Sequence, residues 1–507
     1  MLVPLTPDEH RWEQSKTEPG VIQRRALGVE TVLGRKDANY AGHNDLRIIV
    51  NLSASNTTPS LSTLKEKLED ALLELRFQHP ESALTLAWDE GVVAPRFQYQ
   101  SPASQGAARE WAQGIVHVQA SAKTGLQIWE NIEEQRRCNP QPEKPISVYL
   151  VADVSDENTP LPSGTAVDMV FGMNHVFWDG VSARAFVGDV LKTLSKTLAA
   201  DYEVPAYEWG KETANLNVPI LDGLKPGVEY MGDAFTADSN EFLKASDEGH
   251  GDLGTKVGSG SYAPRIVTHI FSPEQSSLMI KAIKSRLGPK YTITHLGQAA
   301  TTQAMLEINP PSADLPEDAS FVTPISMNGR RWLDDAYAPT FYTACLTSAV
   351  VKFNNVRSLI VDPSDKSAVV QALMKGCEDV KKSFDHWLSK PHHLPVGIAV
   401  HNFSADLMAA NDKSPGQDKE VAVFLSDGLN DRYLPREVVR GDGNEALMAV
   451  NGVLFVLNVP SPFLVVRLES WQGASTLSIG YNGGRYSREQ AEEFLNSVAK
   501  YMLAFAE

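Results

Sequence analysis

The chain has 507 residues, of which 42% are hydrophobic, and its 46 Lys and Arg stand against 63 Asp and Glu for a formal net charge of −17. This length and apolar content predict a globular protein with more than one lobe. Because so negative a surface repels phosphate backbones and anionic lipid, nucleic acid and membranes are excluded as expected partners. An anionic cosubstrate would need a local cluster of Lys and Arg.

Three cysteines stand far apart, at Cys138, Cys345 and Cys377, without a CxxC pair. They predict neither a disulfide framework nor a zinc site, and no metal is expected. The first residues, MLVPLTPDEHRWEQ, lack the basic and apolar regions of a signal peptide, so we expect a cytoplasmic protein. Residues 447–466 are the most apolar stretch, but two asparagines and two prolines interrupt it. This stretch predicts two buried strands and a turn rather than a membrane span.

In the first half of the chain, strand-like and helix-like patterns alternate. Residues 46–52 are predicted to form a strand, and leucines at helical spacing predict a helix over residues 61–77. Apolar runs at 146–154 and 166–173 predict two more strands. A helix follows them, because the apolar positions between 187 and 198 share one helical face.

The second half begins with residues 223–262, which are rich in Gly, Asp and Ser, a composition typical of a linker or surface excursion. Residues 272–287 and 294–306 are predicted helices, and Ser487 to Gln490 has the spacing of a capping box for a last helix. Predicted strands comprise residues 265–271, 320–325, 345–353, 421–425, 452–459, 464–468 and 477–481. The alternation predicts an α/β (α+β) protein with an N-terminal lobe, residues 1–222, a linker, 223–262, and a C-terminal lobe, 263–507.

The sequence His-Val-Phe-Trp-Asp-Gly at residues 175–180 carries the strongest chemical signal. It follows an apolar strand and precedes a helix, so His175 is expected on a strand-to-helix turn. A histidine has an ordinary pKa of about 6.5 and therefore offers a neutral base near pH 7. Asp179 can hold the turn or the imidazole by hydrogen bonds, and Gly180 allows a backbone conformation or a close approach that a Cβ would block. A motif this short also arises by chance.

Three other segments of the chain, taken together with this motif, form a recognisable pattern. Residues 68–82 contain RxxHP at the end of a predicted helix, residues 291–306 read YTITHLGQAATTQAML, and residues 324–333 read PISMNGRRWL. Together with HVFWDG and the closing strand and helix, they resemble the HxxxD acyltransferases, which include BAHD enzymes, condensation domains of nonribosomal peptide synthetases and chloramphenicol acetyltransferase. The tryptophan in HVFWDG, the chain length and the mid-chain insertion look most like fungal trichothecene 15-O-acetyltransferases.

Two departures narrow the resemblance. The DFGWG motif of plant BAHD enzymes is absent, which argues against that branch. Asn174 stands where peptide-forming condensation domains carry the first of two histidines. This replacement favours a stand-alone acyltransferase over an amide-forming module.

The resemblance implies two chloramphenicol-acetyltransferase-like lobes, with mixed sheets flanked by helices and an active-site channel between them. It implies that His175 is the general base in a ternary complex, and that Asp179 is structural, with Arg330 or Arg331 as its partner. Acetyl-CoA is then a cosubstrate, the acceptor is a small terpenoid alcohol, and the enzyme is a monomer without a bound cofactor. Candidates for the oxyanion donor or the substrate pocket are Trp178, Asn328, Tyr342, Phe403 and Asn482.

Several features leave alternatives open. His392 and His393 lie in KPHHLPVG, where a loop is favoured over a metal pair because no third ligand is recognisable. His79 is expected to fix a helix end. The charged run 375–382 is expected to be a solvated helix face, with coenzyme A phosphates as the alternative role. For the whole chain, the alternatives are a condensation-like enzyme that uses a carrier-bound acyl group, and a binding protein without activity.

Overall fold

The computed structural model describes residues 2–507 except 4, 41–44, 139–143, 250–254, 256, 259, 313, 411–421, 442, 444 and 461. Residue 421 of the predicted strand 421–425 and part of the segment 223–262 therefore lie outside the described residues. Within the described part of the chain, no helix is long and apolar enough to cross a membrane.

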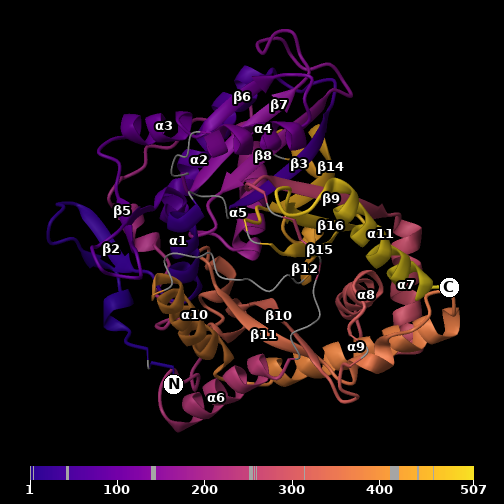
Figure 1. The fold of residues 1–507 in the computed structure, drawn as a ribbon. Coiled ribbons are helices and arrows are strands. Elements are labelled where there is room, and N and C mark those ends of the chain that lie inside the picture. The colour runs from indigo at the N-terminus through magenta and orange to yellow at the C-terminus, as the bar shows by residue number, and fades with distance from the viewer. Residues whose placement is uncertain are drawn as a thin grey trace.

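A six-stranded mixed sheet forms the centre of the N-terminal lobe (Figure 1). Its strand order is β13-β14-β3-β8-β7-β6, and the pair β6–β7 is parallel whereas the others are antiparallel. The strands are β3 (Leu46–Ala54), β6 (Val116–Ala120), β7 (Ile146–Ala152), β8 (Ala166–Met173), β13 (Glu437–Val439) and β14 (Ala446–Leu457). The strands predicted at 46–52, 146–154 and 166–173 are confirmed.

Helices cover both faces of this sheet because side chains of a strand alternate between its two sides. Ile48 and Val50 of β3 pack with the helices α2 (Leu61–Gln78) and α5 (Gly180–Thr197). Ile49 packs with α4 (Gly125–Cys138) on the other face. A small antiparallel sheet and two more helices complete this region: β1 (Glu13–Gln14), β2 (Val21–Arg25), β5 (Arg96–Gln100), β4 (Thr85–Ala87), α1 (Val29–Tyr40) and α3 (Gln105–Gln113).

The C-terminal lobe contains a second mixed sheet of order β12-β15-β16-β9 and a two-stranded ribbon, β10-β11. These strands are β9 (Pro264–Phe271), β10 (Phe321–Asn328), β11 (Leu346–Phe353), β12 (Ala422–Leu429), β15 (Leu464–Trp471) and β16 (Ala474–Asn482). The helices are α7 (Pro273–Arg286), α8 (Ile293–Ile308), α9 (Lys366–Leu388), α10 (His393–Ala410) and α11 (Arg488–Ala504). Helix α8 packs against both α9 and α11. The capping box predicted for the last helix is confirmed at Ser487 and Gln490.

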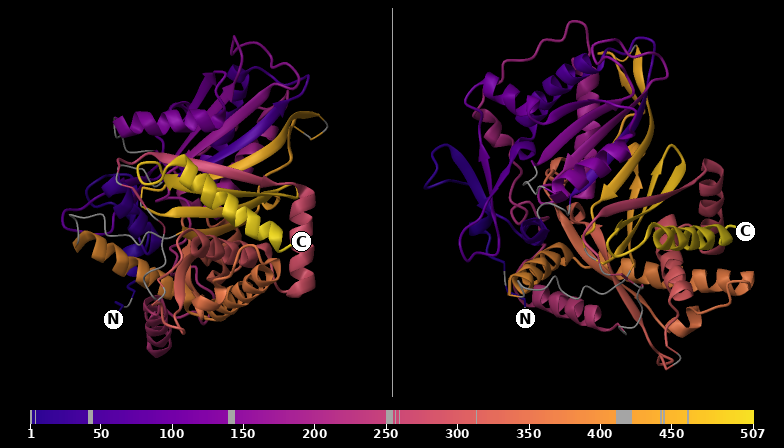
Figure 2. Two further views of the ribbon diagram at one scale, coloured as in Figure 1. Left: turned by 45° about the vertical axis from the view of Figure 1, so that its right-hand side comes forward. Right: turned by 45° about the horizontal axis from the view of Figure 1, so that its top comes forward.

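The chain crosses from the C-terminal lobe to the N-terminal sheet at β14. This strand pairs with β3 of the N-terminal sheet, whereas the next strand, β15, belongs to the C-terminal sheet. Figures 1 and 2 show β14, in gold, extending beside the indigo and magenta strands while β15 and β16 turn toward α11. The two strands predicted within residues 447–466 are confirmed as β14 and β15, and residue 461 of the turn predicted between them lies outside the described residues. The division of the chain at residues 222 and 263 stays a prediction.

The segment 223–262, which the sequence predicted as a linker or surface excursion, contains a helix, α6 (Asp233–Asp247). Phe235 and Phe242 of α6 are buried in the C-terminal core. The helix forms because these two aromatic residues lie seven positions apart, on one helical face, and can be covered by the lobe. Phe235, Phe242 and Leu243 are the only large apolar residues of α6, and a pattern this sparse does not predict the helix from sequence.

Candidate active site

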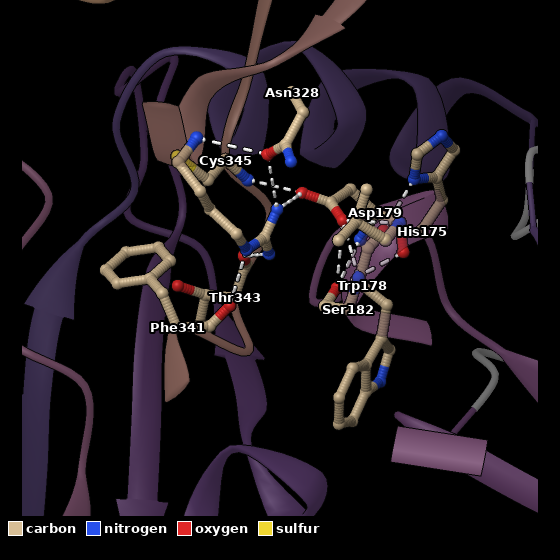
Figure 3. Close-up of polar contacts among 10 residues, drawn as sticks. His175, Trp178, Asp179, Ser182, Asn328, Phe341, Thr343 and Cys345 are labelled. Atoms are coloured by element: carbon tan, nitrogen blue, oxygen red, sulfur yellow. Dashed lines mark hydrogen bonds and ion pairs between the residues drawn. The ribbon is translucent and has the colours of Figure 1, made fainter. Parts of the chain in front are cut away.

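The HVFWDG motif forms the turn between β8 and α5 (Figure 3). Val176, Phe177 and Trp178 are buried in the N-terminal core and anchor the turn. The Trp178 ring packs on Phe186 with centroids 4.8 Å apart, and its Nε1 donates to Pro145 O at 2.9 Å. With the apolar side chains directed inward, the turn presents His175 and Asp179 on either side of itself.

His175 is held in one tautomer by its own turn. Its Nδ1 lies 2.7 Å from the carbonyl oxygen of Trp178, and because a carbonyl only accepts, Nδ1 carries the proton and donates it. The other nitrogen, Nε2, is then an acceptor in the neutral ring. Burial lowers the pKa of His175 to about 4, against the smaller raising effects of Trp178 O and the Asp179 charge. The ring is therefore a neutral base at pH 7.

Asp179 points away from His175 and is saturated with donors (Figure 3). Its Oδ1 accepts from the backbone N–H groups of Val181 at 2.9 Å and Ser182 at 2.8 Å, which makes it the N-cap of α5. Its Oδ2 accepts from Arg330 Nη1 at 2.7 Å and from Cys345 N at 2.8 Å. Burial alone would raise the pKa of Asp179, but the Arg330 charge and these hydrogen bonds outweigh it and lower the pKa.

The structure places Arg330, and not Arg331, beside Asp179. Arg331 is exposed, whereas Arg330 is buried and its guanidinium also donates to Phe341 O at 2.8 Å and Thr343 O at 2.9 Å. Asp179 lies in the N-terminal lobe and Arg330 follows β10 of the C-terminal lobe. The ion pair therefore joins the two lobes directly behind the motif turn.

A cavity of about 330 Å³ opens between the first turns of α5 and the C-terminal lobe. Its lining comprises Val181, Ser182, Ala185, Asn328, Arg330, Ala338, Pro339, Phe341, Tyr342 and Tyr433. Tyr342 is oriented by its hydroxyl, which donates to Asp189, and by the His79 ring at a centroid distance of 4.1 Å. Aromatic and small apolar side chains thus form most of the wall, with polar groups at Ser182, Asn328 and Arg330.

Two of the predicted pocket residues, Asn328 and Tyr342, line this cavity, and three do not. Trp178 is buried, and its single donor is used by Pro145 O. The Asn482 amide accepts from the backbone at 263 and 484 and donates to Pro460 O, so it serves a backbone turn. Phe403 is 42% exposed on α10.

The structure does not support the expected reason for a glycine at position 180. The φ of Gly180 lies outside the left-handed region, so no special backbone conformation is required. A Cβ at this position would lie 3.6 Å from the Phe455 ring and 3.7 Å from Asp427 Oδ1, which are ordinary contacts. The nearest neighbours of Gly180 therefore tolerate an alanine.

The structure also tests the expectations for the histidine pair at 392 and 393 and for the charged run 375–382. The predicted loop at KPHHLPVG is wrong from His393 onward, because α10 begins there and the His393 ring packs among aromatic rings. His392 accepts a hydrogen bond from the Glu229 N–H. Among the described residues, no group of three or more His, Cys, Asp or Glu side chains is placed to hold a metal ion. In the run 375–382, Lys375 binds the carbonyl of Asn354 and Lys381 pairs with Asp385.

Some contributors to the site were missed at the sequence level. Asp45 accepts the backbone N–H of His175 at 3.3 Å, and Cys345 supplies only its backbone N–H to Asp179. No sequence pattern marks either of them. Ser182 is different, because it stands three residues after the Asp179 N-cap and completes a capping box whose spacing was visible in the sequence.

Comparison with known proteins identifies the family. The family model described as 15-O-acetyltransferase Tri3 matches residues 2–405. The chain belongs to this family. It is 42% identical to trichothecene O-acetyltransferase TRI3 of Trichoderma arundinaceum, with 100% of this chain and 99% of the relative covered. It is 38% identical to trichothecene 15-O-acetyltransferase TRI3 of Fusarium sporotrichioides, with 99% of this chain and 98% of the relative covered.

Solved structures agree with this assignment to the Tri3 family. The structure of TRI3 trichothecene 15-O-acetyltransferase from Fusarium sporotrichioides matches with a TM-score of 0.93 at 38% identity, covering 99% of this chain and all of that one. The first condensation domain of the calcium-dependent antibiotic synthetase matches with a TM-score of 0.63 at 13% identity, covering 95% of this chain and 96% of that one, and shares the fold. The two-lobed fold and the resemblance to acetyltransferases are confirmed, and this Tri3-family protein is an acetyltransferase.

Proposed function

We propose that this protein transfers an acetyl group from acetyl-CoA to a hydroxyl of a trichothecene, a terpenoid alcohol, with His175 as general base. The observation that carries the proposal is the tautomer of His175, whose Nδ1 donates to Trp178 O at 2.7 Å and leaves Nε2 to accept a proton. The names of the relatives support the acetyl group and the acceptor class. Since the family description specifies a 15-O-acetyltransferase, a trichothecene with a free 15-hydroxyl is the first acceptor to test.

In the proposed reaction, His175 Nε2 takes the proton of the acceptor hydroxyl while that oxygen attacks the thioester carbonyl carbon. The new C–O bond forms, the C–S bond breaks, and the imidazolium returns its proton to the departing thiolate of coenzyme A. The Trp178 carbonyl, at Nδ1, stabilises the imidazolium formed on the way. A general base accounts for a factor of about 10²–10⁴ in rate, and alignment of the two bound reactants supplies more.

Asp179 and Arg330 contribute to this reaction by holding the His175 turn and α5 in place. Both carboxylate oxygens of Asp179 are occupied by donors, so it has no free acceptor to offer to a substrate proton. Its role in the proposal is to lock the N-terminus of α5 to the C-terminal lobe. A fixed α5 keeps the His175 turn in one position relative to the C-terminal lobe.

The acceptor must bind where its hydroxyl reaches His175 Nε2, within about 2.6–3.2 Å for proton transfer. The cavity of about 330 Å³ is lined by Ser182 and Arg330, which both bond Asp179, and His175 is not part of its lining. The proposal therefore does not place the acceptor in this cavity.

The test is an acetyl-transfer assay with purified protein. We expect thiol release from acetyl-CoA that depends on a trichothecene with a free 15-hydroxyl, and a product heavier by one acetyl group. His175→Ala should lower the rate by at least about 100-fold. His386→Ala, which removes an exposed histidine on α9, is the matched control and should keep the wild-type rate. Equal turnover by His175→Ala would exclude the proposed base.

The same preparation tests the donor. Free coenzyme A should raise the melting temperature, because a ligand of the folded state stabilises it. A donor bound to a carrier protein would instead give no shift with free coenzyme A and no turnover of free acetyl-CoA. A monomer in the cytoplasm is part of the proposal, and gel filtration of the purified protein tests the oligomeric state.

A further inference from the structure

A second group of buried charges lies at the N-terminal end of the motif turn, whose C-terminal end is held by Asp179. It consists of Asp45, immediately before β3, Arg47 on β3, and Glu133 and Arg136 on α4. Their side chains are only 0–6% exposed. We call these four residues the Asp45 network.

The register of the sheet brings Asp45 to His175. β3 and β8 are antiparallel, and Leu46 of β3 lies opposite Met173 of β8. Asp45 therefore lies beside the residues that follow β8. Its Oδ1 accepts the backbone N–H of His175 at 3.3 Å, and its carbonyl oxygen accepts the N–H of Asn458, after β14, at 2.9 Å. Asp45 thus ties the motif turn to the end of the sheet.

Helix α4 holds the carboxylate of Asp45. Residues 45, 47 and 49 share one face of the sheet because side chains alternate along a strand, and Ile49 packs on that face with α4. Glu133 and Arg136 lie three positions apart, on one side of α4. Arg136 Nη2 donates to Asp45 Oδ2 at 2.7 Å, and Arg47 Nη2 donates to Glu133 Oε1 at 2.7 Å. Arg136 Nη1 lies 3.6 Å from Glu133 Oε2, which connects the two pairs.

The hydrogen bond that selects the tautomer of His175 lies between two ion pairs. Its donor, Nδ1, belongs to the residue whose backbone N–H is bound by Asp45, and Asp45 pairs with Arg136. Its acceptor is the carbonyl of Trp178, and the next residue, Asp179, pairs with the buried Arg330. Because a hydrogen bond weakens as its ends move apart or lose alignment, a displaced His175 backbone releases Nδ1 from the carbonyl.

Arg136 contributes orientation to this arrangement. A buried ion pair adds little net stability, because the loss of hydration offsets the attraction between the charges. The last torsion of an aspartate side chain is broad, so a carboxylate without a fixed partner is free to rotate. With Oδ2 held by the guanidinium of Arg136, Oδ1 of Asp45 stays directed at the N–H of His175.

We propose that Arg136 is a positioning residue for the base: it orients Asp45, and Asp45 fixes the backbone of His175 so that Nδ1 stays on Trp178 O. With His175 taken as the base, this rests on the proposed function. Glu133 and Arg47 hold α4 at the distance from β3 that the contact requires. Because Arg136 acts through Asp45 and the backbone, its loss lowers kcat and leaves substrate binding unchanged.

The first measurement needs no substrate. Nitrogen NMR on protein with isotope-labelled histidine reads the tautomer of His175 at pH 7, and the signals are assigned by their absence in His175→Ala. The wild-type ring should be protonated on Nδ1 alone. Arg136→Met removes the charge but keeps a long side chain, and it should give a mixture of the two tautomers. Arg136→Lys retains the charge and should restore most of the wild-type signal.

The second measurement is steady-state kinetics in the acetyl-transfer assay. Arg136→Met should lower kcat at least about tenfold, while KM for each substrate stays within about twofold of wild type. Arg24→Met is the matched control, since it removes another buried arginine, which pairs with Glu30 at 2.6 Å. This control should keep both the wild-type kcat and the wild-type tautomer of His175.

A double-mutant cycle tests whether Arg136 acts through Asp45. Asp45→Asn keeps an acceptor oxygen for His175 but loses the charge that pairs with Arg136, so it should lower kcat and mix the tautomers. Arg136→Met should have little further effect in the Asp45→Asn background. If Arg136→Met fails to fold, the tautomer and kcat of Asp45→Asn decide the question.

The outcomes separate the positioning role from the proposed function. An unchanged tautomer and kcat in folded Arg136→Met, equal losses in Arg24→Met, or full additivity with Asp45→Asn would overturn the positioning role while leaving acetyl transfer intact. A wild-type protein that acetylates no trichothecene would overturn the proposed function, and a tautomer change in Arg136→Met would still support the positioning role. A wild-type ring protonated on Nε2 would overturn both.

Discussion

At the scale of single residues, the carbonyl of Trp178, three positions along the chain, determines which nitrogen of His175 can act as the base. Any histidine offers two nitrogens, and here the contact between Nδ1 and Trp178 O selects Nε2 as the acceptor. The indole of Trp178 contributes indirectly, because its burial and its bond to Pro145 O hold the carbonyl in place. The tryptophan is therefore a support for the base.

The pKa of His175 predicts the pH dependence of transfer. Burial lowers this pKa from 6.5 to about 4, so the ring stays neutral and able to accept a proton down to about pH 5. Because of this low pKa, we expect kcat/KM to stay constant from pH 8 to about 5.5 and to fall only as the pH approaches 4. A pH–rate profile over the range in which the protein stays folded checks this. An acid limb centred at pH 6.5 would contradict it.

Asp179 supports a prediction about stability. Asp179→Asn keeps the shape of the side chain but leaves Arg330 buried without its counter-charge. Removing one partner of a buried ion pair costs about 3–5 kcal/mol, and we expect a loss of this size in urea unfolding. The matched control is Ser487→Ala, which removes the N-cap of α11 and should cost about 1 kcal/mol. A loss below 1 kcal/mol in Asp179→Asn would show that Arg330 finds other partners.

At the scale of elements, α5 connects most of the site. It begins at the Asp179 cap, its first turns line the cavity at Val181, Ser182 and Ala185, and its next turn presses on the Tyr433 backbone at Gly188. Because a helix is stiff over this length, a movement at its N-terminus reaches both the His175 turn and the cavity wall. The lobes therefore meet along α5, in addition to the pairing of β14 with β3 and the packing of α1 on α10.

Helix α6 provides a test at this scale. Phe242 of α6 is 4% exposed and packs on the Trp387 ring at a centroid distance of 5.2 Å. Phe242→Ala should therefore cost about 3–5 kcal/mol in the free energy of unfolding. Phe403→Ala on α10 removes the same side chain from an exposed position and should cost far less. Similar values for the two variants, measured by urea unfolding, would mean that α6 adds little to the core.

At the scale of the whole molecule, the pairing of β14 with β3 of the N-terminal sheet couples the two lobes. β14 pairs with β3, the Arg330–Asp179 ion pair crosses between the lobes, and Arg184 on α5 lies 3.4 Å from Asp427 on β12. Each connection joins residues far apart in sequence. The lobes are therefore one catalytic unit, and a cavity formed by both of them keeps a defined shape.

Buried titratable groups predict the pH dependence of the whole fold. Burial lowers the pKa of four histidines to about 4: His175, His295, His393 and His401. The unfolded chain binds protons at these sites near pH 6.5 while the folded protein does not, so their contribution to stability is lost as the pH falls from about 6.5 toward 4. Two buried carboxyls act in the opposite sense, because burial raises the pKa of Glu81 to about 7 and of Glu469 to about 6.

Since the histidines outnumber the two carboxyls, we expect net proton uptake on unfolding and a lower urea midpoint at pH 5 than at pH 7.5. Unfolding curves at constant ionic strength measure this difference. A midpoint that is unchanged or higher at pH 5 would show that the carboxyls dominate.

The regular elements were predictable wherever a repeated pattern marked them. Leucines at helical spacing predicted α2, apolar runs predicted β7 and β8, and a capping box predicted the start of α11. The helix α6 was missed because Phe235, Phe242 and Leu243 are its only large apolar residues, and the loop predicted at His393 is wrong because a helix begins at this proline-flanked residue. In both cases the apolar residues become informative only once another element covers them.

From the sequence, we predicted an acidic protein of two lobes and the turn that carries His175 and Asp179, because motifs and periodicity are local properties of the chain. The resemblance to acyltransferases added the expected activity and two candidate arginine partners for Asp179. Only the tertiary structure decided that Arg330 is that partner, that β14 crosses to the other lobe, and that Tyr433 enters the cavity. These depend on contacts between segments 100 or more residues apart, and no local pattern encodes which distant surfaces meet.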